Sequence, residues 1–235
     1  SSKNVEPSIK VARSLAPTAA PPVSKVNYEL VQDETTLKTW INTSGIRGIL
    51  AIDTETTSLN SMEASLVGIS LSTEPGKACY IPVAHIKPIE QTILDLGEPD
   101  TDTKKDSGKI KQIPAKKALK LLKPVLEDPS ILKIGHNIKY DLKVLRRYGV
   151  DVAPIDDTMV LSYVLEGAQH GHSMDELSLL HLKHKTIKFK DVVGSGKSQI
   201  TFDKVPLEQA LGYAAEDADI TCRLFHVLKP RLLTE

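Results

Sequence analysis

Short apolar runs dominate the hydrophobic pattern between residues 49 and 83, and they predict β-strands. Runs rich in Val, Ile and Leu occupy residues 49–54, 66–72 and 78–83, with the length and composition of buried strands. Gly76 marks a turn between the second and third runs, so a meander is expected. A fourth strand is predicted at residues 131–135, with a short additional one at 28–31.

Helical periodicity dominates the rest of the chain. Apolar positions three and four residues apart predict helices at 35–42, 137–148, 159–165, 174–183 and 207–228, and one that begins after Pro114. Asp157 and Ser173 are suited to cap two of these helices, and Gly149 to end another. Because strands and helices alternate, the expected fold class is α/β, a mixed β-sheet flanked by α-helices.

Two stretches lack either pattern. Residues 1–25 combine several prolines with Ser, Ala and Lys, a composition that predicts a linker or flexible tail. Residues from about 95 to 113 are polar and charged, and they predict a surface insertion. The remainder, residues 26–235, is expected to form one domain. Since the first residue is Ser rather than Met, we interpret the chain as an excised fragment.

Charge and cysteine content narrow the function classes. Thirty Lys and Arg residues balance thirty Asp and Glu residues, so no global field draws the protein to nucleic acid or membrane. No apolar run approaches the roughly 18 residues needed to span a bilayer. Cys79 and Cys222 have no metal or redox spacing, and we expect both to be buried apolar residues.

The first strand ends in two carboxylates, Asp53 and Glu55. Residues i and i+2 of a strand point to the same face, so these side chains are predicted to project together. Adjacent carboxylates repel one another unless a proton or a cation lies between them. Their hard oxygen atoms suit Mg²⁺ or Mn²⁺.

Two later segments offer the further ligands that such a site requires. Asn137 and Asp141 are four residues apart at the start of a predicted helix, and Tyr213 and Asp217 have the same spacing on another. Asp219 lies about 200° around the helix axis from Asp217, so both cannot face one site. Each pair alone is more typical of a cap or of ordinary packing, whereas the ordered set indicates a divalent metal site.

Two other patterns are set aside. Gly194-Ser195-Gly196-Lys197-Ser198 ends like a phosphate-binding loop, but Asp191 replaces the required earlier glycine and no strand precedes it. Four histidines could suggest zinc, but they lack thiolate partners and a His-Glu-x-x-His helix, so we expect them to be structural or exposed. They are His170, His172, His181 and His184.

The ordered set resembles the three motifs of the DEDD exonuclease superfamily, in its tyrosine-bearing branch. The motifs are Asp53-Thr54-Glu55-Thr56, Asn137-x-x-x-Asp141 and Tyr213-x-x-x-Asp217. Further segments resemble the 3′–5′ proofreading exonuclease domain of bacterial family A DNA polymerases, the DNA polymerase I family. They are Tyr80-Ile81-Pro82-Val83-Ala84-His85, Leu182-Lys183-His184-Lys185-Thr186-Ile187 and Tyr213-Ala214-Ala215-Glu216-Asp217-Ala218-Asp219. The resemblance covers roughly residues 26–232.

The resemblance implies an RNase H-like fold and a two-metal hydrolysis that releases nucleoside monophosphates from DNA 3′ ends. On this basis Asp53, Glu55 and Asp217 hold one Mg²⁺ (or Mn²⁺). Asp53 and Asp141 hold a second, and Tyr213 positions the attacking water with Glu55. An unperturbed tyrosine titrates near ~10, so orientation of the water is favoured over proton abstraction.

The resemblance also implies substrate contacts and partners. Leu59 is placed against the terminal base and Phe189 against the unpaired strand, although an ordinary core position is an equal alternative for both. Thr56 and Asn137 are placed near the scissile phosphate, and His136 stands where relatives have Gln. The implied partners are a single-stranded or frayed DNA 3′ end and the polymerase domain of a parent chain. A monomer in the bacterial cytoplasm, associated with the nucleoid and not with a membrane, is expected.

Between residues 183 and 204 four lysines outnumber two aspartates. They form either a patch that meets the phosphate backbone or an ordinary solvated surface. The lysines are Lys185, Lys188, Lys190 and Lys197.

Two other functions remain open. The chain could be a stand-alone enzyme similar to ribonuclease D, acting on RNA, but it lacks the extra helical domains of such enzymes. It could also be a catalytically silent scaffold beneath a polymerase. The presence of all four carboxylates and Tyr213 argues against the silent scaffold.

Overall fold

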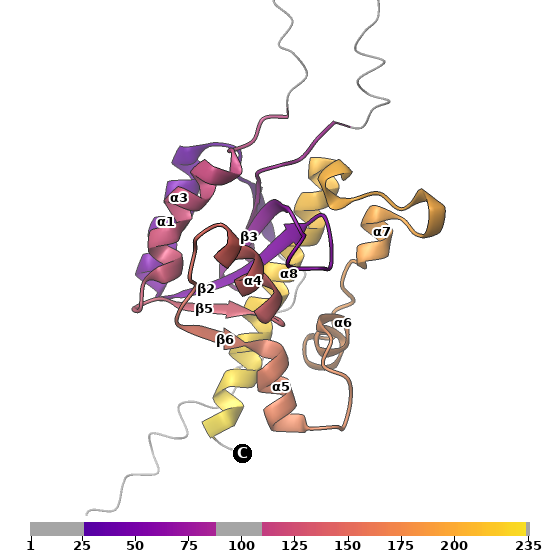
Figure 1. The fold of residues 1–235 in the computed structure, drawn as a ribbon. Coiled ribbons are helices and arrows are strands. Elements are labelled where there is room, and N and C mark those ends of the chain that lie inside the picture. The colour runs from indigo at the N-terminus through magenta and orange to yellow at the C-terminus, as the bar shows by residue number, and fades with distance from the viewer. Residues whose placement is uncertain (1–25, 88–109, 234–235) are drawn as a thin grey trace, which may run out of the picture.

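The computed structural model describes residues 26–87 and 110–233. They form a mixed six-stranded sheet with helices on both faces (Figure 1), as the sequence predicts. The predicted tail at 1–25 and most of the predicted insertion at 95–113 lie outside these residues. Within the described part, no helix is long and apolar enough to cross a membrane.

The strand order across the sheet is β1-β4-β3-β2-β5-β6. The central β2 pairs antiparallel with β3 and parallel with β5, and β3 continues antiparallel to β4. The edge strands β1 and β6 are parallel to β4 and β5, respectively. The strands are β1 (Asn27–Leu30), β2 (Ile49–Thr56), β3 (Leu66–Glu74), β4 (Lys77–Pro82), β5 (Leu132–Gly135) and β6 (Ile155–Asp157). The sequence did not predict β6, because three residues after a proline are too few to show a period.

The helices also follow the predicted pattern, with two corrections. The predicted helix 137–148 begins only at Lys139, since Asn137 has a left-handed backbone (φ 57°). The predicted helix 174–183 changes at Ser178 into a π-helix. The helices are α1 (Glu34–Arg47), α3 (Ala115–Glu127), α4 (Lys139–Arg147), α5 (Thr158–Glu166), α6 (Met174–Leu177), η2 (Ser178–Leu182), α7 (Phe189–Val193), η3 (Gly196–Ser198), η4 (Phe202–Lys204), α8 (Leu207–Leu228) and η5 (Lys229–Leu233).

Alternation along β2 separates the two faces of the sheet. Leu50 and Ile52 belong to the core formed with the α1, α3 and α4 side, whereas Ala51 packs in the core on the α8 side. Figure 1 shows α1 and α3 next to each other on one side and α8 running along the other. Because side chains alternate, Asp53 and Glu55 project toward α8 and Thr54 projects toward α4.

Small residues let α8 approach the sheet closely. Ala214, Ala215 and Ala218 are fully buried, and α8 contacts β2, β3 and β4. The sequence also predicts a core position for Trp40 and burial of both cysteines. The structure confirms these predictions.

A buried ion pair fixes α8 to the edge of the sheet. Asp219 accepts hydrogen bonds from Arg223 Nε (2.9 Å), from the Gly76 backbone N–H (2.7 Å) and from the Tyr28 hydroxyl (3.0 Å). Both side chains of the pair are essentially inaccessible to solvent. Asp219 therefore serves the packing of α8, which confirms that it does not share a site with Asp217.

Replacing Arg223 by alanine is expected to lower the free energy of unfolding by about 3–5 kcal/mol, because Asp219 would keep a buried charge without its cation. Urea unfolding followed by circular dichroism measures the change. Arg146→Ala is the matched control, since its pair with Asp151 is exposed and is expected to change stability by less than about 1 kcal/mol. Equal losses in the two variants would contradict the assignment.

Candidate active site

Three carboxylates from two elements meet beside the sheet. Asp53 and Glu55 come from β2, and Asp217 comes from the middle of α8. One carboxylate oxygen from each side chain lies within 4.8 Å of the corresponding oxygens of the other two. The structure thus brings Asp217 together with two residues that precede it by more than 160 positions in the chain.

The electrostatics of this group call for a cation. Burial raises the pKa of Asp53 to about 6. Burial first, and then the charges of neighbouring carboxylates, raise the pKa values of Glu55 and Asp217 well above the ordinary range. Glu55 Oε1 is buried and has no hydrogen-bond partner. Such a group must hold protons or a divalent cation at neutral pH, and its oxygen-only donor set fits Mg²⁺ or Mn²⁺.

Asp141 lies close by but outside this group of three. It is buried at the start of α4 and accepts hydrogen bonds from the Thr54 backbone N–H (3.0 Å) and hydroxyl (2.5 Å). Thr54 projects from the α4 face of β2, which explains why Asp141 approaches from the other side. Burial first, and next the charge of Asp53, raise the pKa of Asp141, so the two carboxyls are electrostatically coupled.

Tyr213 stands one helical turn before Asp217 and packs against two aromatic rings. Its ring centroid lies 5.9 Å from that of Phe189 and 5.9 Å from that of Phe202. Burial, followed by the charges of Asp217 and Glu55, raises the pKa of Tyr213 far above its ordinary value. The hydroxyl therefore stays protonated at neutral pH and can orient a water molecule but not deprotonate it.

Asp53, Glu55 and Asp217 line a cleft of about 680 Å³, whereas Asp141 is not among its lining residues. Thr56 and Leu59 line one part of it, and Phe189 and Tyr213 another. Leu59 is 92% exposed and Phe189 is 40% exposed, so the alternative of ordinary core positions is wrong for both. None of the described residues lining the cleft is Lys or Arg. The acidic group is therefore not neutralised by a neighbouring basic side chain of the lining.

His136 and Asn137 are not among the residues that line the cleft. His136 Nδ1 lies 2.9 Å from the Thr158 hydroxyl oxygen, and burial lowers the pKa of His136 to about 4. The exposed Asn137 donates its backbone N–H to Asp157 Oδ1 (3.0 Å). The turn between β5 and α4 is thus held by Asp157, which accepts from the backbone N–H groups of Asn137 and Ile138.

Sequence reasoning missed Tyr140 and Phe202, which line the same cleft. The Tyr140 hydroxyl lies 2.5 Å from the Thr56 hydroxyl and donates to the Ser58 carbonyl (2.5 Å). Tyr140 directly precedes Asp141, and this adjacency is the one sequence signal that could have identified it. Phe202 stacks on Phe189 with an interplanar angle of 8°, a pairing that only the tertiary structure reveals.

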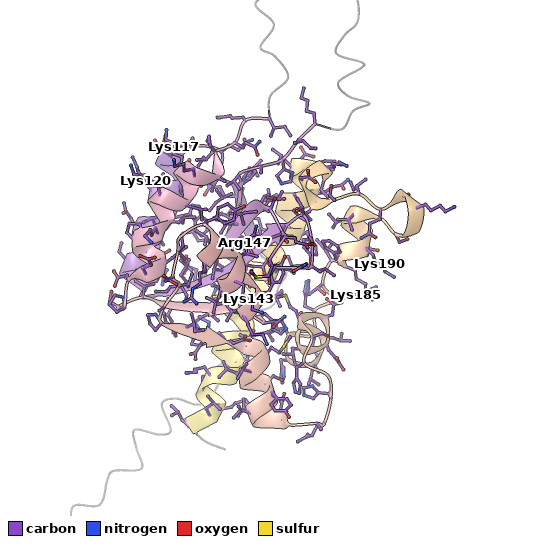
Figure 2. The ribbon with its side chains drawn as sticks, in the orientation of Figure 1. Lys117, Lys120, Lys143, Arg147, Lys185 and Lys190 are labelled. Atoms are coloured by element: carbon purple, nitrogen blue, oxygen red, sulfur yellow. The ribbon has the colours of Figure 1, made fainter. Side chains whose placement is uncertain are left out.

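Two charged side chains, one buried and one exposed, hold segments next to the cleft. The buried Glu216 on α8 accepts from the Ile187 backbone N–H (2.6 Å) and lies 2.8 Å from His184 Nε2, which fixes the segment before α7. The exposed Arg147 donates to the carbonyls of Ser61 (3.0 Å) and Ala64 (2.6 Å). Figure 2 shows Arg147 on α4, beside the loop that carries Leu59.

Known proteins are similar to this chain in sequence and in fold. A family model described as 3′-5′ exonuclease matches residues 28–233. DNA polymerase I of Rhizobium leguminosarum is 44% identical over 214 residues, which are 87% of this chain and 20% of that protein. The chain spans about a fifth of the length of the curated relatives it matches.

Solved structures share the fold at lower identity. Brucella melitensis NrnC aligns with a TM-score of 0.60 and 24% identity, covering 89% of this chain and 82% of that one. Escherichia coli RNase D aligns with a TM-score of 0.58 and 19% identity, covering 89% of this chain and 45% of that one. These neighbours confirm the RNase H-like architecture. By the match over residues 28–233, the chain belongs to the 3′-5′ exonuclease family, as an exonuclease domain of the DNA polymerase I type.

Proposed function

We propose that this domain, residues 26–235, hydrolyses the terminal phosphodiester of DNA from the 3′ end and releases nucleoside monophosphates. The observation that carries the proposal is the group formed by Asp53, Glu55 and Asp217. Its oxygens converge within 4.8 Å at a cleft whose described lining contains no basic residue. A polyanionic substrate can enter such a site only when cations screen the carboxylates.

The donor set fits two divalent cations, Mg²⁺ or Mn²⁺. Asp53, Glu55 and Asp217 would hold one of them, and Asp53 with Asp141 the other. When bound, the cations supply Lewis-acid stabilisation of the charge that develops on the phosphate and on the departing 3′ oxygen. The raised pKa values of the carboxyls support this assignment, because cations would replace the protons that the group otherwise requires.

The other polar groups orient the water. The protonated Tyr213 hydroxyl and the Glu55 carboxylate would hold a water molecule in line with the scissile bond. The water oxygen forms a bond to phosphorus, the bond from phosphorus to the 3′ oxygen breaks, and a proton ends on that 3′ oxygen. The Phe189 and Phe202 rings that pack against Tyr213 keep the tyrosine ring in one position.

The apolar and basic side chains around the cleft suit a strand of any sequence. Leu59 would press against the terminal base and Phe189 against the unpaired strand, since such contacts do not depend on base identity. Thr56 would lie near the scissile phosphate. Lys185 and Lys190 are exposed near α7 (Figure 2) and would meet the phosphate backbone with Lys188 and Lys197.

The positions of His136 and Asn137 do not favour a direct contact with the substrate. Both were expected to touch the substrate, but neither lines the cleft. We propose that they position the β5–α4 turn, and through it Asp141, and that they do not contact the scissile phosphate.

RNA is the second candidate substrate, because the fold neighbour from Escherichia coli is described as an exoribonuclease. The choice depends on contacts to the 2′-hydroxyl. The test incubates the protein and Mg²⁺ with a DNA strand that carries a label at its 5′ end. A matched RNA strand is tested in parallel. Stepwise shortening of the DNA by single nucleotides is expected, and faster degradation of the RNA would reverse the substrate assignment. Absence of shortening of either strand would favour a silent scaffold.

Replacing Leu59 by alanine is expected to raise the KM for a single-stranded DNA end by about 3- to 10-fold, because about 1 kcal/mol of apolar contact with the base is lost. The melting temperature should not change, since Leu59 is 92% exposed. Ile46→Ala is the matched control, as Ile46 is 85% exposed on α1 and is absent from the cleft lining. Steady-state kinetics that give the same KM for both variants would rule out the contact.

The proposed biological setting follows from the relatives. The domain would act as the proofreading module of a DNA polymerase I in the bacterial cytoplasm, close to the nucleoid. Its partners would be a frayed 3′ end and the polymerase domain of the same polypeptide, and the exonuclease domain itself would be monomeric.

A further inference from the structure

We propose a second metal site, separate from the acidic cleft, in which Glu166, His170 and His181 bind one Zn²⁺ or a chemically similar ion such as Co²⁺. One ligand atom from each residue lies within 4.8 Å of the other two. Glu166 ends α5, His170 lies in the loop that follows, and His181 belongs to the π-helix η2. This proposal does not depend on the proposed nuclease function.

The contacts of His170 leave the lone pair of its Nε2 atom facing the Glu166 carboxylate. His170 Nδ1 lies 2.6 Å from the Gly171 carbonyl oxygen, which only accepts, so Nδ1 carries the ring proton. In the neutral ring Nε2 then has a free lone pair. It lies 2.9 Å from Glu166 Oε2, another acceptor. Two acceptors at this distance require a positive species between them, either a proton or a metal ion.

His181 places a second ring nitrogen next to Glu166 Oε2. Its Nε2 lies 3.3 Å from Glu166 Oε2, yet this buried atom makes no hydrogen bond. Zinc bonds of about 2.0–2.1 Å at tetrahedral angles place ligand atoms about 3.3 Å apart. The separations of 2.9 and 3.3 Å therefore need only small adjustments. The π-helical turn that carries His181 is a geometry found frequently at functional sites.

The hydrogen bonds that surround Glu166 and His170 favour metals that bind nitrogen over Mg²⁺. Arg231 donates to Glu166 Oε1 (2.7 Å), which leaves Oε2 for the metal and holds the carboxylate in place. Because Arg231 offsets the carboxylate charge, the site depends on its two imidazoles, which suit Zn²⁺, Co²⁺ or Ni²⁺. The Nδ1–H to carbonyl bond of His170 is the usual outer support of a metal-binding histidine.

The neighbouring His172 is excluded as a ligand. Its Nδ1 lies 2.9 Å from the Ser162 hydroxyl and its Nε2 lies 2.8 Å from the Gly167 carbonyl, so both nitrogens are engaged. The sequence does not predict zinc here, because these histidines lack thiolate partners and a His-Glu-x-x-His helix. The structure instead supplies a carboxylate from the end of α5 and a histidine from another helix, a combination that no local motif reports.

The ion would join three segments of the chain. The 167–172 loop, the π-helix η2 and, through Arg231, the 3-10 helix η5 all meet at Glu166. A bound ion therefore replaces separate weak contacts by one cross-link. We expect saturating Zn²⁺ to raise the melting temperature by about 5 °C.

The experiment uses the full 235-residue chain with Asp53→Asn and Asp217→Asn, which removes oxygen-only binding at the acidic cleft. Isothermal titration with Zn²⁺ and visible absorption with Co²⁺ measure binding. One equivalent of ion is expected, with a visible Co²⁺ band typical of a four-coordinate site that contains nitrogen, and Mg²⁺ at the same concentration should not displace it. In the same background, His170→Ala and His181→Ala should each weaken binding at least ~10²-fold. His226→Ala should not, because His226 is exposed on α8 and serves as the control.

Several outcomes would overturn the proposal. They are no ion taken up by the background chain, equal affinity after loss of His170 or His181, and displacement by Mg²⁺. No uptake of ion would mean that a proton alone lies between His170 and Glu166. Equal affinity of the alanine variants, or displacement by Mg²⁺, would place the bound ion at another site. If an alanine variant fails to fold by circular dichroism, the Co²⁺ spectrum of the background chain decides by itself. Because that background is already inactive by design, failure of this site leaves the proposed nuclease function untouched.

Discussion

Replacing Asp53 by asparagine is expected to reduce Mg²⁺-dependent shortening of a 5′-labelled DNA strand by at least ~10³-fold. Asp53 is the carboxylate assigned to both cations, and an amide supplies neither the charge nor the second anionic oxygen. Gel analysis of a time course at saturating Mg²⁺ measures the rate. Asp175→Asn is a suitable control, since Asp175 is a carboxylate of the neighbouring α6 and is absent from the cleft lining.

The same substitution should stabilise the protein when no metal is present. Burial raises the pKa of Asp53 from 3.8 to about 6, so the stabilising effect of its protonated form is complete below pH 4 and is lost as the pH rises through 6. The metal-free parent should therefore melt at a lower temperature at pH 8 than at pH 5. At pH 8 the asparagine variant should gain about 1–3 kcal/mol, or on the order of 5 °C. Mg²⁺ should remove most of this difference by stabilising the parent.

These two results test different things. Loss of activity without stabilisation of the metal-free protein would mean that the buried charge of Asp53 does not destabilise the fold. Unchanged activity would remove Asp53 from the mechanism and leave the domain a scaffold.

Replacing Tyr213 by phenylalanine is expected to lower kcat by about 10- to 100-fold with little change in KM. The hydroxyl is assigned to orient the water, a contribution that is felt in the transition state and not in binding. Burial and the neighbouring carboxylates raise the pKa of Tyr213, which favours the protonated hydroxyl at neutral pH. The pH dependence of kcat below pH 9 should therefore be the same in the variant and the parent.

Tyr163→Phe is the matched control for this substitution, because Tyr163 is 63% exposed on α5. It should retain full activity. The half-saturating Mg²⁺ concentration should stay within a few-fold in Tyr213→Phe, since the four carboxylates remain. A rise of kcat with pH that is present in the parent and absent from Tyr213→Phe would show that the tyrosine acts as a base, against the assignment made here.

The hydrophobic pattern and a few charged residues determined much of this protein. Five of the six strands that the structure describes and the long C-terminal helix were predictable because their buried faces repeat with fixed periods. Asp53 and Glu55 could be placed on one face because alternation in a strand is strict, and Asp219 could be separated from Asp217 because the turn of a helix is equally regular. These are local rules, and they hold before the chain folds.

The tertiary structure decided what no local rule contains. The shortest strand, β6, exists because β5 provides a partner, and the turn after β5 is set by backbone hydrogen bonds to Asp157. His136 and Asn137, which follow β5, do not line the cleft. Leu59 and Phe189 are exposed because a cleft forms between their segments. Glu166, His170 and His181 meet because α5, a loop and η2 converge. Convergence of distant segments depends on packing of the whole domain, whereas periodicity depends only on neighbouring residues.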